Sequence, residues 1–83
     1  MKLTLEKAKE YLEKLNRFRE INEILANINY HPEMSEEEIS KLLSEEGFLL
    51  TDLVEMEKQY HGNRIEFEKA CERVIKTNRE MII

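Results

Sequence analysis

Three residues in this sequence are of the types that bind metals or act as nucleophiles: His31, His61 and Cys71. A zinc site needs several such ligands at short, fixed spacings, and the chain contains no CxxC, HxxxH or HExxH pattern. Cys71 falls on an apolar helical stripe, where a buried and unreactive thiol is the usual outcome. Glycine-rich phosphate-binding loops are absent from the sequence as well. We therefore expect no catalytic residue, no metal site and no cofactor, and a protein that is not an enzyme.

The stretch from Ser35 to Glu55 has the cadence of a DNA-binding helix-turn-helix, with a capped helix, a glycine and a second helix start. A recognition helix must bring hydrogen-bond donors to base edges and basic side chains to phosphates. Here the turn would carry Glu45 and Glu46, and the second helix would open with Asp52. These carboxylates would face phosphates, so the sequence disfavours direct nucleic-acid binding through this element.

The acidity of the chain is concentrated in its middle third. Nine of the 18 acidic residues lie between Glu33 and Glu57, where Lys41 is the only base, although the net charge of the whole chain is only −5. Such a field repels nucleic acids and anionic membranes and attracts proteins with a basic surface. A solvated helix surface is the simpler interpretation of the same charges. The side chains that we expect to contact a basic protein partner are Glu36, Glu37, Glu45, Glu46, Asp52, Glu55 and Glu57.

An apolar stripe with helical spacing predicts a first helix of about 24 residues, beginning after an N-cap at Thr4. Proline disfavours helical backbone at the residue before it, so Pro32 places the helix end near Ile28 or Asn29. This helix is long for so short a chain, and the shorter helices would cover only part of its stripe. We therefore expect a homodimer through the helix middle, at Leu15, Phe18 and Ile21, unless these three residues belong to the chain's own core.

The remaining helices are predicted from capping signals. Ser35 with Glu38 forms a capping box that predicts the start of a second helix. Gly47 predicts its end as a left-handed cap, with Phe48 packing back on Leu43.

Two further capping boxes predict a third and a fourth helix, one at Asp52 with Glu55 and the other at Asn63 with Glu66. One long helix from Asp52 to about Arg79, which tolerates Gly62 at a cost of about 1 kcal/mol, is the alternative.

These elements predict an all-α fold: a single helical domain over residues 1–83, built as a small bundle of three or four helices with a long first helix. The predicted core consists of Leu12, Leu15, Ile21, Leu25, Ile39, Leu42, Leu43, Leu53, Phe67 and Val74. The sequence has no apolar run near the roughly 20 residues of a membrane span, no apolar signal region at its start, and one cysteine only. We therefore expect a soluble, cytoplasmic protein that does not contact membranes.

The apolar end Met81-Ile82-Ile83 is expected to dock on the core, with a partner interface as the alternative.

The function that fits best is that of a non-enzymatic interaction or regulatory protein, which binds another protein through the acidic face on residues 33–57. A nucleic-acid-mimicking inhibitor of a DNA- or RNA-binding enzyme, of the kind that phages make, is the alternative. A small DNA-binding regulator that uses the basic residues of the first and last helices is the weakest candidate.

Overall fold

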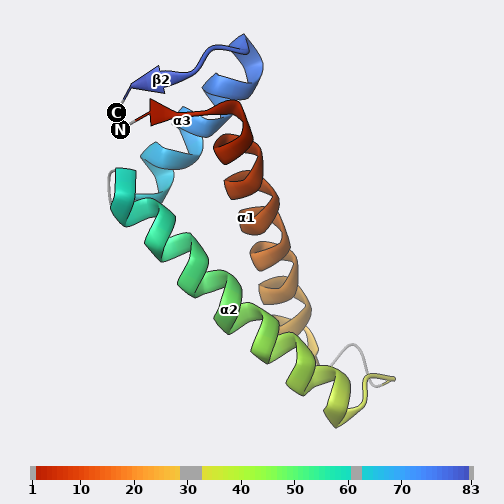
Figure 1. Ribbon diagram of the computed structural model, residues 1–83. Helices are drawn as coiled ribbons and strands as arrows, with labels where there is room; N and C mark the ends of the chain where they lie inside the picture. The colour runs from red at the N-terminus through yellow and green to blue at the C-terminus, as the bar shows by residue number, and fades with distance from the viewer. Residues whose placement is uncertain (1, 29–32, 61–62, 83) are drawn as a thin grey trace.

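The computed structural model describes residues 2–28, 33–60 and 63–82, which form three helices and two short strands (Figure 1). The elements follow in the order β1 (Lys2–Leu3), α1 (Leu5–Ala26), α2 (Glu36–Tyr60), α3 (Arg64–Thr77) and β2 (Met81–Ile82). The strands pair antiparallel, with Lys2 opposite Ile82 and Leu3 opposite Met81, and bring the two chain ends together. The predicted all-α class and the long first helix are confirmed.

Helix α1 begins and ends at polar side chains. The Thr4 hydroxyl accepts a hydrogen bond from the Lys7 backbone N–H at 3.1 Å, as expected for its N-cap role. At the other end, the Asn27 side-chain amide donates to the Glu23 carbonyl at 2.9 Å and its backbone N–H also bonds back into the last turn. This side chain ends the helix two residues before the predicted Ile28. His31 and Pro32 lie outside the described residues.

The predicted helix end at Gly47 is wrong, because α2 runs unbroken from Glu36 to Tyr60. The Ser35 N-cap is correct, since its hydroxyl accepts from the Glu38 N–H at 3.2 Å. The predicted cap at Asp52 and the packing of Phe48 on Leu43 after a turn are wrong with it. A glycine inside a helix costs only about 1 kcal/mol, which tertiary contacts can outweigh.

Contacts with α1 on both sides of Gly47 supply that compensation. Glu45 and Asp52 each form an ion pair with a base of α1, and Leu53, the residue after Asp52, is fully buried. The burial of this face of α2 therefore favours one straight helix over two short ones.

The predicted interruption before Asn63 is confirmed, and the alternative of one helix over residues 52–79 is wrong. Helix α2 ends at Tyr60 and α3 begins at Arg64, where the Asn63 side chain accepts from the Glu66 N–H at 3.2 Å. His61 and Gly62 lie outside the described residues. Asn78 ends α3 in the left-handed region, with φ of 54°.

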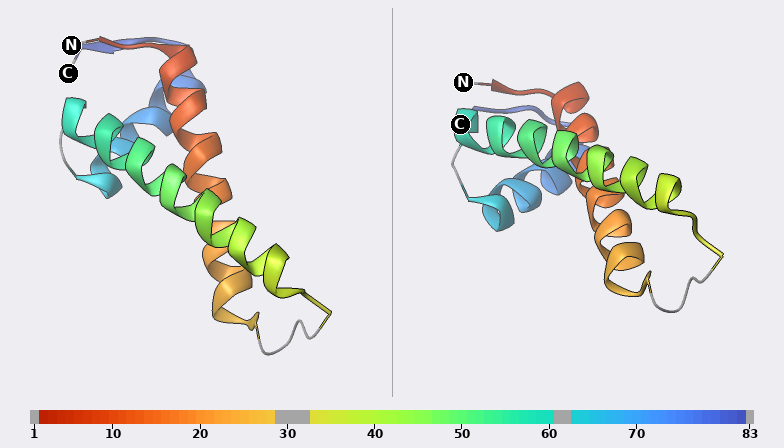
Figure 2. Two further views of the ribbon diagram at one scale, coloured as in Figure 1. Left: turned by 60° about the horizontal axis from the view of Figure 1, so that its bottom comes forward. Right: turned by 90° about the horizontal axis from the view of Figure 1, so that it is seen from below.

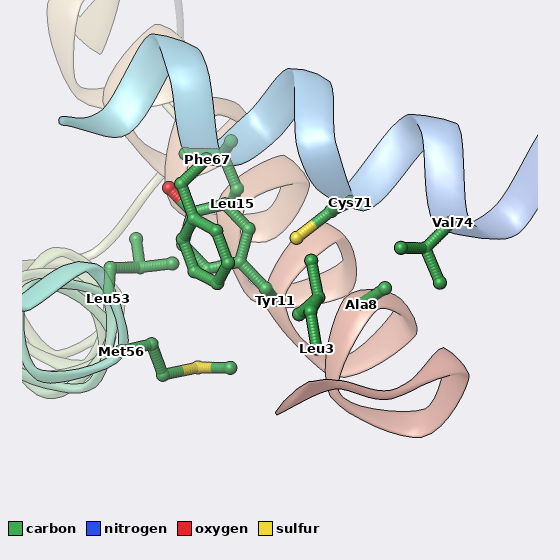
Figure 3. Close-up of a cluster of buried hydrophobic side chains, with 9 residues drawn as sticks. All are labelled: Leu3, Ala8, Tyr11, Leu15, Leu53, Met56, Phe67, Cys71 and Val74. Carbon is green, nitrogen blue, oxygen red and sulfur yellow. The ribbon is translucent and has the colours of Figure 1, made fainter. Parts of the chain in front are cut away.

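The core lies where all three helices meet (Figure 3). Tyr11 and Phe67 lie at its centre with ring centroids 4.4 Å apart, and Tyr60 stacks on the other side of Phe67 at 4.7 Å. The side chains that form the buried cluster are Leu3, Ala8, Tyr11, Leu15, Leu53, Met56, Phe67, Cys71 and Val74.

Five of the ten predicted core residues are fully buried: Leu15, Ile21, Leu53, Phe67 and Val74. Leu12, Leu25, Ile39 and Leu42 are only half-buried. Leu43 is 52% exposed, so its assignment to the core is wrong. The reason is the unbroken α2, whose inward face runs through Ile39, Leu42, Leu49 and Leu53 at helical spacing and turns Leu43 to solvent.

The molecule is elongated, with principal extents of 46 × 22 × 18 Å. Figures 1 and 2 show α3 beside the N-terminal half of α1 and the C-terminal end of α2, while the opposite end consists of α1 and α2 alone. We call that opposite end, residues 20–28 and 33–50, the two-helix arm. Half of α2 therefore has one neighbouring helix and one face open to solvent.

Candidate protein-binding surface on α2

Glu57, the last acidic residue expected to meet a partner, is instead part of the interior. Glu57 is only 7% exposed. Its Oε2 accepts hydrogen bonds from the Tyr11 hydroxyl at 2.7 Å and from Arg64 Nε at 2.8 Å. The Arg64 guanidinium also lies over the ring of Phe18, 5.5 Å from its centroid. These contacts tie α1, α2 and α3 together, so the carboxylate of Glu57 is not available to a partner here.

Glu45 and Asp52 lie toward α1 and pair with its bases. Arg17 donates to both carboxylate oxygens of Glu45, from Nε at 2.6 Å and from Nη2 at 3.0 Å, and Lys14 donates to Asp52 at 2.8 Å. The hydrogen bond from Arg17 lowers the pKa of Glu45, and the hydrogen bond to Asp52 raises the pKa of Lys14. Both acids hold the two helices together, which explains Glu45 without reference to a partner.

Three other predicted contact residues, Glu36, Glu37 and Glu55, are exposed. Glu37 lies only within a weak 3.7 Å pairing distance of Lys41 on its own helix, and Glu36 and Glu55 form no ion pair within the described parts of the chain. Glu36 and Glu37 belong to the first turn, where the helix dipole favours negative charge. Glu46 is half-buried and also unpaired among the described residues. The acids left for a partner are therefore fewer than the sequence predicted.

The side of α2 that faces away from α1 exposes large apolar side chains. Phe48 is 75% exposed, Leu43 52% and Leu50 41%, although the predicted fold gave Leu43 a core position and Phe48 a contact with Leu43. Small residues lie between them, and shallow grooves pass beside Phe48. We call this surface the outward face of α2 and define it as Ser40, Lys41, Leu43, Ser44, Gly47, Phe48, Leu50, Thr51, Glu55 and Lys58.

The centre of the outward face is smooth and less polar than its sequence suggests. The Thr51 hydroxyl donates to the Gly47 carbonyl at 3.0 Å, within the helix, so its proton is not available to a partner. A Cβ atom added at Gly47 would meet no atom within 4 Å other than those of the adjoining residues and of the helix's own backbone. Another molecule can therefore come close to the backbone of α2 at Gly47.

The sequence did contain a signal for this face. Leu42-Leu43 and Phe48-Leu49-Leu50 place apolar residues at consecutive positions, and one helix cannot turn consecutive residues to the same side. The predicted turn at Gly47 removed this conflict by giving Phe48 a cap contact. Without the turn, Leu43 of the first run and both Phe48 and Leu50 of the second run have to face solvent.

The predicted dimer residues are placed inside the chain. Leu15 and Ile21 are fully buried, and Phe18 is half-buried against the core and under Arg64. These three residues therefore serve the chain's own packing, which was the alternative for them.

The described residues give little basis for covalent or metal chemistry. Cys71 is buried, and burial raises the pKa of its thiol to about 12, which suppresses the reactive thiolate. Among residues 2–28, 33–60 and 63–82, no group of three His, Cys, Asp or Glu side chains is placed to hold a metal ion. Within the same residues no helix has the length and apolarity needed to cross a bilayer.

The chain matches no protein-family model, no curated protein and no solved structure at a significant level of similarity.

Proposed function

We propose that this chain is a non-enzymatic interaction protein that binds another protein through the outward face of α2. The observation that carries this proposal is the exposure of Phe48, which presents 75% of its surface to solvent in the middle of that face. Burying such a side chain contributes about 1.5–3 kcal/mol, and large aromatic residues dominate the energy of protein interfaces.

The charges around the face favour a partner with a basic rim. Glu37 lines a groove beside Phe48, Glu55 lies two turns further along the outward face, and Glu36 is exposed in the first turn of α2. Among the described residues, no base of α1 or α3 forms an ion pair with these three acids. Opposite charge on the partner would speed the encounter and fix the orientation, while the apolar centre would supply most of the affinity. The expected partner surface therefore combines an apolar groove for Phe48 with Lys or Arg at its edge.

Nucleic-acid mimicry has weaker support in this geometry. Glu45 and Asp52 are paired with Arg17 and Lys14, and Glu57 is buried, so three of the seven acids do not add to an exposed negative surface. A mimic of a phosphate backbone also has no use for an exposed Phe48. A partner surface that is purely basic would favour this alternative in the experiment below.

Site-specific photo-crosslinking tests the proposal. Benzoylphenylalanine in place of Phe48 should capture a protein other than this chain from cells of the source organism. The matched control carries the same group at Ile65 on α3, which is 64% exposed and lies away from the outward face. Equal capture of the same proteins from both positions would contradict the proposal.

Charge removal then tests the role of the acids with the captured protein in purified form. The triple change Glu36→Gln, Glu37→Gln and Glu55→Gln should weaken binding and reduce its dependence on salt, because exposed charges act through a field that salt screens. Glu13, Glu23 and Glu72 are exposed acids of α1 and α3, and their replacement by Gln changes the net charge equally. If both triple variants bind alike, the acids around Phe48 have no specific part in recognition.

A further inference from the structure

The folded chain exposes more surface than its mass requires. A compact protein of 10.0 kDa exposes about 5,200 Å², whereas this chain exposes 6001 Å². Its radius of gyration is 15.1 Å, against about 12 Å for a compact domain of this length. The excess area is of the same order as the roughly 800 Å² that each partner buries in a standard protein interface.

Gly47 has no explanation within the single chain. It lies in the middle of a 25-residue helix, where glycine costs about 1 kcal/mol relative to alanine. Apart from the adjoining residues and the helix's own backbone, no atom lies within 4 Å of the place where a Cβ would be. Glycine on a helix surface permits another backbone to come close. The open position at Gly47 therefore points to a helix from outside the chain.

We propose that a second copy of this chain packs its own α2 antiparallel against the outward face, about a twofold axis that passes between Gly47 and Phe48. In such a pair, each residue before the axis lies opposite a residue equally far beyond it in the other copy. The two polypeptides approach most closely at Gly47, Ser44 and Thr51, which are small.

The charges along the face are complementary in this one arrangement. Read along α2, the outward face carries Lys41, Glu55 and Lys58, and the exposed acids Glu36 and Glu37 precede them in the first turn, so the sign changes from minus to plus, to minus and to plus. In the antiparallel pair, Lys41 of each copy lies beside Glu55 of the other, and Glu36 lies beside Lys58. A parallel pair would place each of these charges beside its own copy, so like charges would meet.

The apolar side chains agree with the same arrangement. Phe48 lies next to the axis, so that its ring meets the ring of the other copy on one side of the small-residue centre. Leu43 of each copy lies on the other side, close to Leu50 of its partner. All three are large and exposed in the single chain, and all three become covered in the pair.

This inference uses the same face as the proposed function and goes beyond it, because the second copy would cover the face until another protein displaces it. The two can fail separately. A chain that remains monomeric overturns the self-association and leaves a capture of another protein at Phe48 intact. Crosslinks at Phe48 that join only copies of this chain would contradict the proposed function and support the dimer.

Sedimentation equilibrium over the micromolar range tests the dimer, with an expected mass of twice 10.0 kDa at the upper concentrations. The variants Lys41→Glu and Glu55→Lys should each weaken dimerisation by about tenfold or more, because like charges meet at two symmetric places. The double variant carries both changes and should recover the lost affinity, since opposite charges meet again. A wild-type chain of 10.0 kDa at every concentration, or a double variant as weak as the single ones, would overturn the proposal.

Gly47→Leu separates association from folding. Leucine favours the helix, and its side chain meets no atom of the chain near the Cβ position, so the monomer should unfold at an unchanged or higher temperature. In the dimer the same side chain would hold the two helices apart. A Gly47→Leu chain that still dimerises like the wild type would show that the copies do not approach at Gly47.

Discussion

The end of the molecule that contains α3 has a core of fully buried side chains, whereas the two helices of the two-helix arm contact each other mainly through half-buried and exposed side chains. All the fully buried side chains of α2 and α3 lie in the first of these regions, from Leu53 onward along α2. In the arm, among the described residues, Ile21 alone is fully buried, and the bidentate contact between Arg17 and Glu45 spans the two helices. We infer that the end with α3 contributes most of the stability of the fold, whereas the two-helix arm mainly contributes exposed surface.

The largest expected effect comes from a pair of phenylalanine variants, one in each of the two regions. Phe67 is fully buried between Tyr11 and Tyr60, so Phe67→Ala should lower the free energy of unfolding by about 3–5 kcal/mol. Phe48 is 75% exposed, so Phe48→Ala should change the stability of the monomer by less than about 0.5 kcal/mol. Urea unfolding of dilute protein measures both, and similar losses would show that the arm belongs to the cooperative core.

A smaller effect is expected from the polar contact that joins the three helices at the end with α3. The Tyr11 hydroxyl donates to the buried carboxylate of Glu57, and a hydrogen bond to a charged group contributes about 1.5–3 kcal/mol. Tyr11→Phe should therefore lower the free energy of unfolding by that amount. Burial and the adjacent Glu57 also raise the pKa of Tyr11.

The control for this variant is the second tyrosine of the same aromatic cluster. Tyr60 is half-buried and its hydroxyl forms no hydrogen bond with the described residues, so Tyr60→Phe should leave stability nearly unchanged. If Tyr11→Phe is equally harmless, Glu57 is held by Arg64 alone.

The sequence was most informative where the chain is locally determined. The caps at Thr4, Ser35 and Asn63 depend on a side chain and a backbone N–H three residues on, and all three were predicted. The end of a helix at a glycine is different, because it depends on whether burial further along outweighs a small local cost. Contacts of α1 with Asp52 and Leu53 decided it, and sequence spacing does not contain those contacts.

The candidate site was predicted only in part for the same physical reason. Because a turn was predicted at Gly47, the directions in which Glu45 and Phe48 point were predicted wrongly. On the unbroken helix, Glu45 turns toward Arg17, and Phe48 turns to solvent. Pairing between distant segments also determined the fate of Glu57, whose partners Tyr11 and Arg64 come from two other helices. The acidity of the middle third was visible at once, but which charges remain exposed depended on the packing of α1.

The smallest expected effect is that of lowering the pH, which should loosen the two-helix arm before the end with α3. Arg17 lowers the pKa of Glu45 below its ordinary value of 4.5, so the folded state binds that proton less tightly than the unfolded state. The ion pair therefore stabilises the fold above pH 4.5, and its contribution is lost as the pH falls through the lowered pKa of the folded state. Both side chains are partly exposed, so the contribution is modest and is reduced by salt. The protection factors for amide hydrogen exchange should consequently fall in the first half of α2 at a higher pH than around Phe67. Glu45→Gln should abolish this early step, whereas Glu46→Gln, at a neighbouring position without an ion pair, should preserve it. Equal acid sensitivity at both ends of the molecule would show that the contact between Arg17 and Glu45 does not hold the arm together.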